Sequence, residues 1–249
     1  MAKLKSLLKI EGTLDGMTFY KGKDGYLVRT KGGVSKSRIE NDPAFIRTRE
    51  NGSEFGHLAK SGKVLRQALA PLLIEVKDTS ITARVMKLMS QIKNTDTTSI
   101  RGSRNVATGL TTNEGKGFLK GFDFNANAKL SSVLLTEYQL NQTTGEISIT
   151  NLNPLQQISI PGGATHVGFI AGVLSLDFAT GQKELQWSPE VKVPINNTET
   201  TINAIPTSIP TGSGQTIYVF KIGFYQEINA VQYPLNNGTF NVLHIIEVL

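Results

Sequence analysis

The chain has 249 residues, of which 39% are hydrophobic and 18% are charged, and these values are ordinary for a globular protein that buries a core. It contains no cysteine, which excludes disulfides, thiol catalysis and cysteine-ligated zinc. No apolar run approaches the roughly 18–20 residues needed to span a bilayer, and the first ten residues, MAKLKSLLKI, lack the continuous apolar segment of a signal peptide. We therefore expect a cytoplasmic protein, or part of a particle assembled in the cytoplasm, with no membrane span.

The formal net charge of +6 is divided unevenly along the chain. Residues 1–120 carry 22 Lys and Arg against 11 Asp and Glu, whereas residues 121–249 carry 4 against 9. Such asymmetry is typical either of a nucleic-acid-binding surface or of electrostatic pairing between parts. In a self-assembling protein the basic half of one copy can meet the acidic half of the next, which generates rings or open filaments.

Residues 6–31 predict a meander of three short strands. Asp15-Gly16 and Asp24-Gly25 are the turn signals, because Asp-Gly readily adopts the positive φ of tight hairpins. Three short strands alone are only marginally stable. We expect this sheet to pack on the helices, on the C-terminal half or on another subunit.

A basic, glycine-rich segment follows at residues 31–38. It resembles a phosphate-binding loop only superficially, since no glycine has Walker spacing and no Gly-Lys-Ser/Thr occurs in the chain. This composition favours a surface loop or an inter-subunit arm.

Residues 41–93 predict two amphipathic helices. Asp42-Pro43 is a helix start, a break is expected near Gly52 because glycine disfavours helix interiors, and Pro71 begins a third segment or a kink. The second helix follows a cap within residues 78–80 and has one apolar face. That face comprises Ile81, Val85, Leu88, Met89 and Ile92, and Arg84, Lys87 and Lys93 fall off it.

Residues 94–120 are a polar connector with one short helix near residues 105–110. From residue 121 onward, short strands alternate with turns every 8–12 residues, which is typical of an all-β sandwich. The strands are predicted at residues 129–135, 136–140, 146–149, 157–160, 166–176 (broken near Gly172), 185–187, 190–195, 216–228 and 240–248. The predicted fold is thus α+β, with a basic meander and helical module at 1–120 and an acidic antiparallel β-sandwich, Ig-like or jelly-roll-like, at 121–249.

No residue pattern predicts catalysis, a cofactor or a metal. His57, His166 and His244 lack a carboxylate or serine at motif spacing, so a structural role is favoured for each. Asp177 and Glu184 flank a turn, and sequence alone does not place them across a cleft. Trp187 is the only tryptophan, so an aromatic platform for carbohydrate is not evident.

Residues 12–56, GTLDGMTFYKGKDGYLVRTKGGVSKSRIENDPAFIRTRENGSEFG, resemble the start of a group of uncharacterised proteins of Bacteroidota genomes. The similarity extends through Arg66 and RGSRN and returns in GFYQEINAVQYPLNNGTFN. The group has no established activity, so the resemblance implies only a bacterial or phage-derived protein whose basic N-terminal segment is its distinctive part.

We therefore expect a non-enzymatic structural subunit that self-assembles into a filament, tube or virion-like particle, without cofactors. Its basic arm and helix faces would dock on the acidic β domain of a neighbouring copy. The alternatives are a nucleic-acid-binding protein that uses the basic half, and a carbohydrate- or ligand-binding module. The candidate contact residues are Lys31, Lys36, Arg38, Arg47, Arg49, Lys60, Lys63, Arg66, Arg84, Arg101 and Arg104.

Overall fold

The computed structural model describes residues 2–3, 9–30 and 33–249, so Lys31 lies outside the described residues. The chain forms two compact units, Met1–Asn51 and Gly52–Leu249. The domain boundary predicted between residues 120 and 121 falls inside the second unit. Side chains from both sides of that position share one core there.

The first unit contains the predicted meander. Its strands are β1 (Ala2–Lys3), β2 (Gly12–Leu14), β3 (Met17–Gly22) and β4 (Gly25–Thr30), paired in the order β1-β4-β3-β2. The Asp15-Gly16 turn has positive φ at both residues, as its sequence predicts. The last part of the predicted loop at residues 31–38 is helical instead. The Ser35 hydroxyl caps a short helix there, α1 (Lys36–Asn41).

The helix start at Asp42-Pro43 is confirmed. Pro43 begins the 3-10 turn η1 (Pro43–Phe45), and the Asp42 carboxylate accepts the N–H of Ala44 at 2.9 Å. The break expected at Gly52 is wrong, because α2 (Ile46–Ala68) runs through it. Gly52 and Gly56 are exposed, with open space where a side chain would lie. Each costs about 1 kcal/mol against alanine, which the packing of the later turns around Leu58 and Leu65 offsets.

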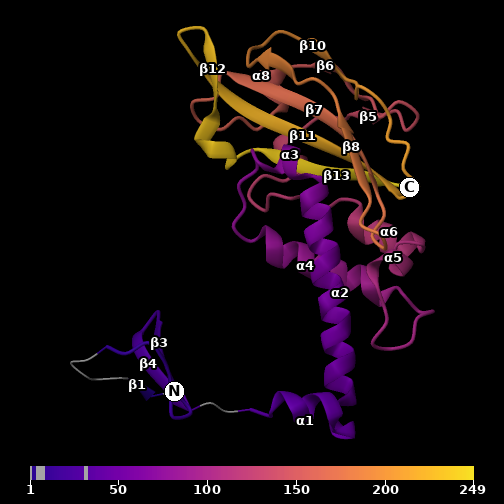
Figure 1. Cartoon of the computed structure of the whole chain (residues 1–249). Coiled ribbons are helices and arrows are strands. Elements are labelled where there is room, and N and C mark those ends of the chain that lie inside the picture. The colour runs from indigo at the N-terminus through magenta and orange to yellow at the C-terminus, as the bar shows by residue number, and fades with distance from the viewer. Residues whose placement is uncertain (1, 4–8, 31–32) are drawn as a thin grey trace. The chain divides into compact units, whose positions relative to one another are not determined.

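Four more helices of the second unit share one core with α2 and form a layer with it (Figure 1). They are α3 (Ala70–Leu73), α4 (Ile81–Asn94), α5 (Val106–Gly109) and α6 (Asn113–Leu119). The apolar stripe of α4 is confirmed, since Val85, Leu88, Met89 and Ile92 are buried. Pro71 lies in the first turn of α3, and the predicted short helix is α5, which the Asn105 side chain caps.

All strand pairs of the second unit are antiparallel. The larger sheet contains β7 (His166–Leu176), β8 (Lys183–Trp187), β9 (Val191–Pro194), β11 (Gln215–Ile228), β12 (Val231–Pro234) and β13 (Val242–Val248). The smaller sheet has the order β10-β6-β5, with β10 at Thr200–Ala204, β6 at Ile147–Leu152 and β5 at Gln139–Leu140.

Three strand predictions need correction. No break occurs at Gly172, because β7 pairs with β11 continuously from His166 to Leu176. Residues 129–135 contain a helical turn, α7 (Leu130–Val133). Residues 157–160 begin with the last residue of α8 (Pro154–Gln157) and then form an isolated bridge between Ile158 and Leu134 rather than a regular strand. Pro154 at the start of α8 favours that turn.

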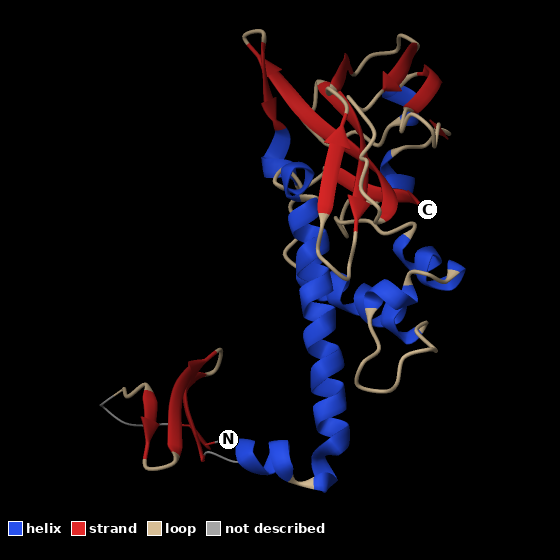
Figure 2. Ribbon diagram, turned by 45° about the vertical axis from the view of Figure 1, so that its right-hand side comes forward, coloured by secondary structure: helices blue, strands red, loops and turns tan. Residues whose placement is uncertain are grey.

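The central strands of the larger sheet, β7 and β11, are buried on both faces along most of their length. Ile170, Leu174, Ile217 and Val219 point into a core shared with the helices, whereas the alternate residues point into a second core shared with the smaller sheet. Figure 2 shows the resulting order of helices, larger sheet and smaller sheet. The α+β class and the β-rich C-terminal part are therefore confirmed.

Glycines allow α4, α5 and α6 to approach closely. A β-carbon on Gly109 would lie 2.2 Å from the carbonyl oxygen of Ile92, and one on Gly115 would lie 2.1 Å from the carbonyl oxygen of Gly109. Both contacts are with backbone, which cannot rotate away. These helices must therefore separate if either residue gains a side chain.

We expect Gly115→Ala to lower the free energy of unfolding by roughly 1–3 kcal/mol or more, because overpacking against backbone forces the helices apart. Gly117→Ala in the same helix is the matched control, since the space beside Gly117 is open. It should be neutral or stabilising by up to about 1 kcal/mol. Urea unfolding followed by circular dichroism checks both, and equal stabilities would contradict the packing described.

Candidate functional site

The predicted basic residues fall into three groups in the structure. Lys36, Arg38 and Arg47 are exposed and pair with acids one helical turn away. The nitrogen–oxygen distances are 3.6 Å from Lys36 to Glu40, 3.0 Å from Arg38 to Asp42 and 3.0 Å from Arg47 to Glu50. Such exposed pairs contribute little to stability, so these side chains remain available to a partner.

A second group holds the helices in place. Arg49 donates hydrogen bonds to the carbonyls of Ile39 (2.7 Å) and Asp42 (3.0 Å), which fixes the turn between α1 and α2. Arg66 donates to the carbonyl of Gly62 and to the hydroxyl of Thr82, both at 3.2 Å, and so links α2 to α4.

Arg84 was expected on a free basic face of α4, but its guanidinium binds groups of the protein itself. It pairs with Asp78 at 2.8 Å, donates to the carbonyl of Asp123 at 2.5 Å and lies over the ring of Phe122. Burial opposes ionisation of Asp78, yet hydrogen bonds from Ser80, from the backbone of Ala126 and from Arg84 lower its pKa to about 2.

Arg104 belongs to a buried ionic cluster on Glu54. Its guanidinium binds both carboxylate oxygens, at 2.8 and 3.0 Å, and Lys93 Nζ lies 2.6 Å from Oε2. Lys93 was expected off the apolar face of α4, but it is 92% buried because Glu54 compensates its charge. Arg104 above all, with Lys93 and the N–H of Gly102, lowers the pKa of Glu54 to about 2.

The remaining candidates do not gather into one site. Lys60, Lys63 and Arg101 are exposed, and Lys60 lines a hollow of about 330 Å³ with His57 and Ser103. Two of the histidines have protein partners: His244 Nδ1 lies 2.7 Å from Asp123, and His166 Nδ1 lies 3.0 Å from the Thr165 hydroxyl.

Within the described ranges, no group of three or more His, Asp or Glu side chains could hold a metal ion. In the same part of the chain, no helix is long and apolar enough to cross a membrane.

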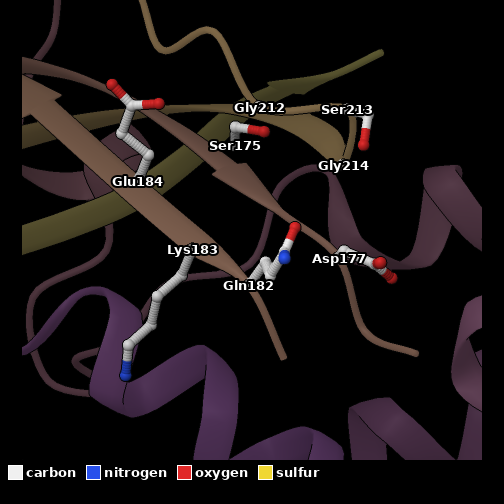
Figure 3. A pocket seen from close by; sticks show the side chains of 8 residues that line it. All are labelled: Ser175, Asp177, Gln182, Lys183, Glu184, Gly212, Ser213 and Gly214. Atoms are coloured by element: carbon white, nitrogen blue, oxygen red, sulfur yellow. The ribbon is translucent and has the colours of Figure 1, made fainter. Parts of the chain in front are cut away.

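A pocket lies where β7 and β8 meet the loop before β11 (Figure 3). Its volume is about 390 Å³. The lining residues are Ser175, Asp177, Gln182, Lys183, Glu184, Gly212, Ser213 and Gly214. We call it the Ser175 pocket.

Two glycines shape the Ser175 pocket. A β-carbon on Gly214 would lie 2.3 Å from the backbone of Leu176, so only glycine lets the loop lie against the end of β7. A β-carbon on Gly212 would lie 2.7 Å from the hydroxyl oxygen of Ser175, so this glycine leaves the hydroxyl uncovered. The sequence predicted residues 212–214 as a turn, and no local signal places them beside Ser175.

The two carboxylates of the Ser175 pocket are held by the protein. Asp177 accepts hydrogen bonds from the Thr180 hydroxyl (2.6 Å) and from the N–H of Ala179 (2.8 Å), and these bonds lower its pKa. Glu184 accepts the N–H of Thr211 at 3.0 Å. Hydrogen bonds from the protein therefore fix both carboxylates in place.

Trp187 lies at the other end of β8. It is 41% exposed and lines a separate hollow of about 320 Å³ with Gln186, Ser188, Pro189 and Thr207. Trp187 is the single aromatic residue of that lining.

Comparisons of the chain with protein-family models, with curated proteins and with solved structures found no match.

The Glu54 cluster predicts an acid-sensitive contribution to stability. Its carboxyl has a folded pKa of about 2 against an ordinary value of 4.5, which corresponds to roughly 3 kcal/mol. This contribution is present above about pH 4.5 and is lost as the pH falls toward 2. We expect Glu54→Gln to lower the free energy of unfolding at pH 7 by roughly 3–5 kcal/mol, because Lys93 and Arg104 lose their shared counter-ion.

Urea unfolding from pH 7 to pH 3 measures both effects. The loss of stability on acidification should be smaller in Glu54→Gln than in the wild type. Glu199→Gln, an exposed residue, is the control and should match the wild type. An unchanged pH dependence in Glu54→Gln would contradict the assignment.

Proposed function

We propose that this chain is a non-enzymatic structural subunit that self-assembles into a filament, tube or particle. The basic first unit of one copy docks on the acidic, β-rich part of a neighbour. The observation that carries this proposal is the lack of any buried side chain in the described part of the first unit, residues 9–30 and 33–51.

The sheet of the first unit carries apolar side chains without covering them. Leu14, Met17, Phe19 and Val28 share one face by the strand register. Leu14 is 60% exposed and Met17 is 42% exposed. A small sheet without a core is marginally stable in water, so covering this face in a second molecule would stabilise both the fold and the assembly.

The charge of the first unit complements the C-terminal half. Residues 1–51 carry 11 Lys and Arg against 6 Asp and Glu, whereas residues 121–249 carry 4 against 9. Lys9 and Lys21 lie beside the ring of Tyr26, and Arg29 lies over Tyr20 on the opposite face. A cover for this sheet therefore needs apolar groups and carboxylates together, which favours the acidic half of another copy.

The β11–β12 hairpin offers such a surface. It continues beyond the last residue of β11 that pairs with β7, Tyr225. Its exposed apolar residues share one face by the strand register: Ile228 (51%), Val231 (49%) and Tyr233 (52%). The carboxylate of Glu227 lies on the opposite face of the hairpin. Among the described strands β12 pairs with β11 alone, so its outer edge is free to receive another strand.

This contact joins two different surfaces, so it is heterologous and can repeat from copy to copy. We expect the sedimentation coefficient of the purified chain to rise with protein concentration at about 0.1 M salt and to fall at about 1 M salt. The Debye length shortens from roughly 10 Å to 3 Å between these conditions. Negative-stain electron microscopy of the low-salt sample should show regular assemblies.

Leu14→Lys combined with Met17→Lys should reduce association at least tenfold, and Val231→Lys should do the same from the other side of the contact. Leu155→Lys is the control, because Leu155 is 53% exposed but lies elsewhere, on α8. A strictly monomeric wild type, or equal association by all four proteins, would overturn the proposal. Salt-sensitive binding of a labelled oligonucleotide by the monomer would favour the nucleic-acid alternative instead.

A further inference from the structure

Ser175 has a hydroxyl that opens into the pocket and is left without a protein partner. The residue is 96% buried near the end of β7. Within the part of the chain that the structure describes, its hydroxyl makes no hydrogen bond, although it lines the Ser175 pocket. The hydroxyl oxygen is open to the pocket, so a ligand that enters there can complete its hydrogen bonding.

We propose that the Ser175 pocket binds an uncharged, hydroxyl-rich ligand of monosaccharide size. The site lies within the second unit and is independent of the assembly contact.

The groups around the opening indicate a ligand without charge. Figure 3 shows the side chains of Ser175, Gln182 and Ser213 around it, whereas Lys183 extends away toward a helix. Hydroxyls and carboxamides both donate and accept hydrogen bonds. Hydroxyl groups on a ligand also donate and accept hydrogen bonds, so they can pair with each of these side chains in either direction.

Charged ligands fit less well. An anion would meet the carboxylates of Asp177 and Glu184, while the nearest lining cation, Lys183, points elsewhere. A cation would find those carboxylates already bound to Ala179, Thr180 and Thr211. Within the described residues, moreover, no cluster of acidic and histidine side chains could hold a metal ion.

The volume sets the size of the ligand. Binding pockets for small molecules span about 300–1,000 Å³, and the Ser175 pocket, at about 390 Å³, lies near the lower limit. One sugar ring suits this space. The ring could be a free monosaccharide or the terminal residue of a glycan, and both present the same hydroxyl chemistry.

The test uses the full chain and a panel of neutral monosaccharides: an aldohexose, a 6-deoxyhexose and an N-acetylhexosamine. Saturation-transfer NMR and calorimetry detect binding of the free sugars, and a glycan array detects terminal residues. We expect one class to bind. Ser175→Ala should weaken that binding at least tenfold while leaving the urea midpoint unchanged or higher, because the hydroxyl forms no bond in the free protein.

Gly212→Ala should weaken binding to a similar extent, because its β-carbon covers the Ser175 hydroxyl. Gly162→Ala is the matched control, since that loop glycine has open space beside it and should bind as the wild type. Absence of binding on every arm, or wild-type affinity in Ser175→Ala, would overturn the proposal. A lower urea midpoint in Ser175→Ala with no sugar binding would also overturn it, since the hydroxyl would then hold an ordered water only.

Discussion

The ladder between β7 and β11 is the constraint on which the second unit depends. The two strands pair through eleven residues, from His166–Tyr225 to Leu176–Gln215, and apolar side chains point from both faces. A sheet that is apolar on both faces needs cover on both. The helices supply one cover and the smaller sheet the other. The ionic cluster on Glu54 then joins α2, α4 and the segment before α5 within the helical layer.

Sequence patterns predicted the elements whose signals are local. The Asp-Gly turns, the Asp42-Pro43 start and the stripe of α4 depend on a few neighbouring residues, and all are confirmed. The break at Gly52 was wrong because tertiary packing of the later turns of α2 outweighs one unfavourable glycine. Lys93 was placed outside the core because its partner, Glu54, lies 39 residues away, and no periodicity reveals such a pair.

The same limit applies to the candidate sites. A count of charges shows that the arginines gather in the first 104 residues. It could not distinguish Arg84 and Arg104, which bind internal carboxylates, from Arg38 and Arg47, which remain exposed. The Ser175 pocket could not be predicted because a loop 37 residues further along the chain covers the end of β7. Gly212 shapes the pocket through its closeness to the Ser175 hydroxyl, and the local sequence does not reveal that contact.

The first unit differs from the second in lacking a core among its described residues, and the proposed assembly follows from that difference. The most direct test is hydrogen–deuterium exchange of the backbone amides of β3 and β4, measured over a range of protein concentrations. We expect exchange in Met17–Gly22 and Gly25–Thr30 to slow strongly as the concentration rises, because a neighbouring copy covers the sheet. Exchange that is independent of concentration, in a protein that stays monomeric, would contradict the account.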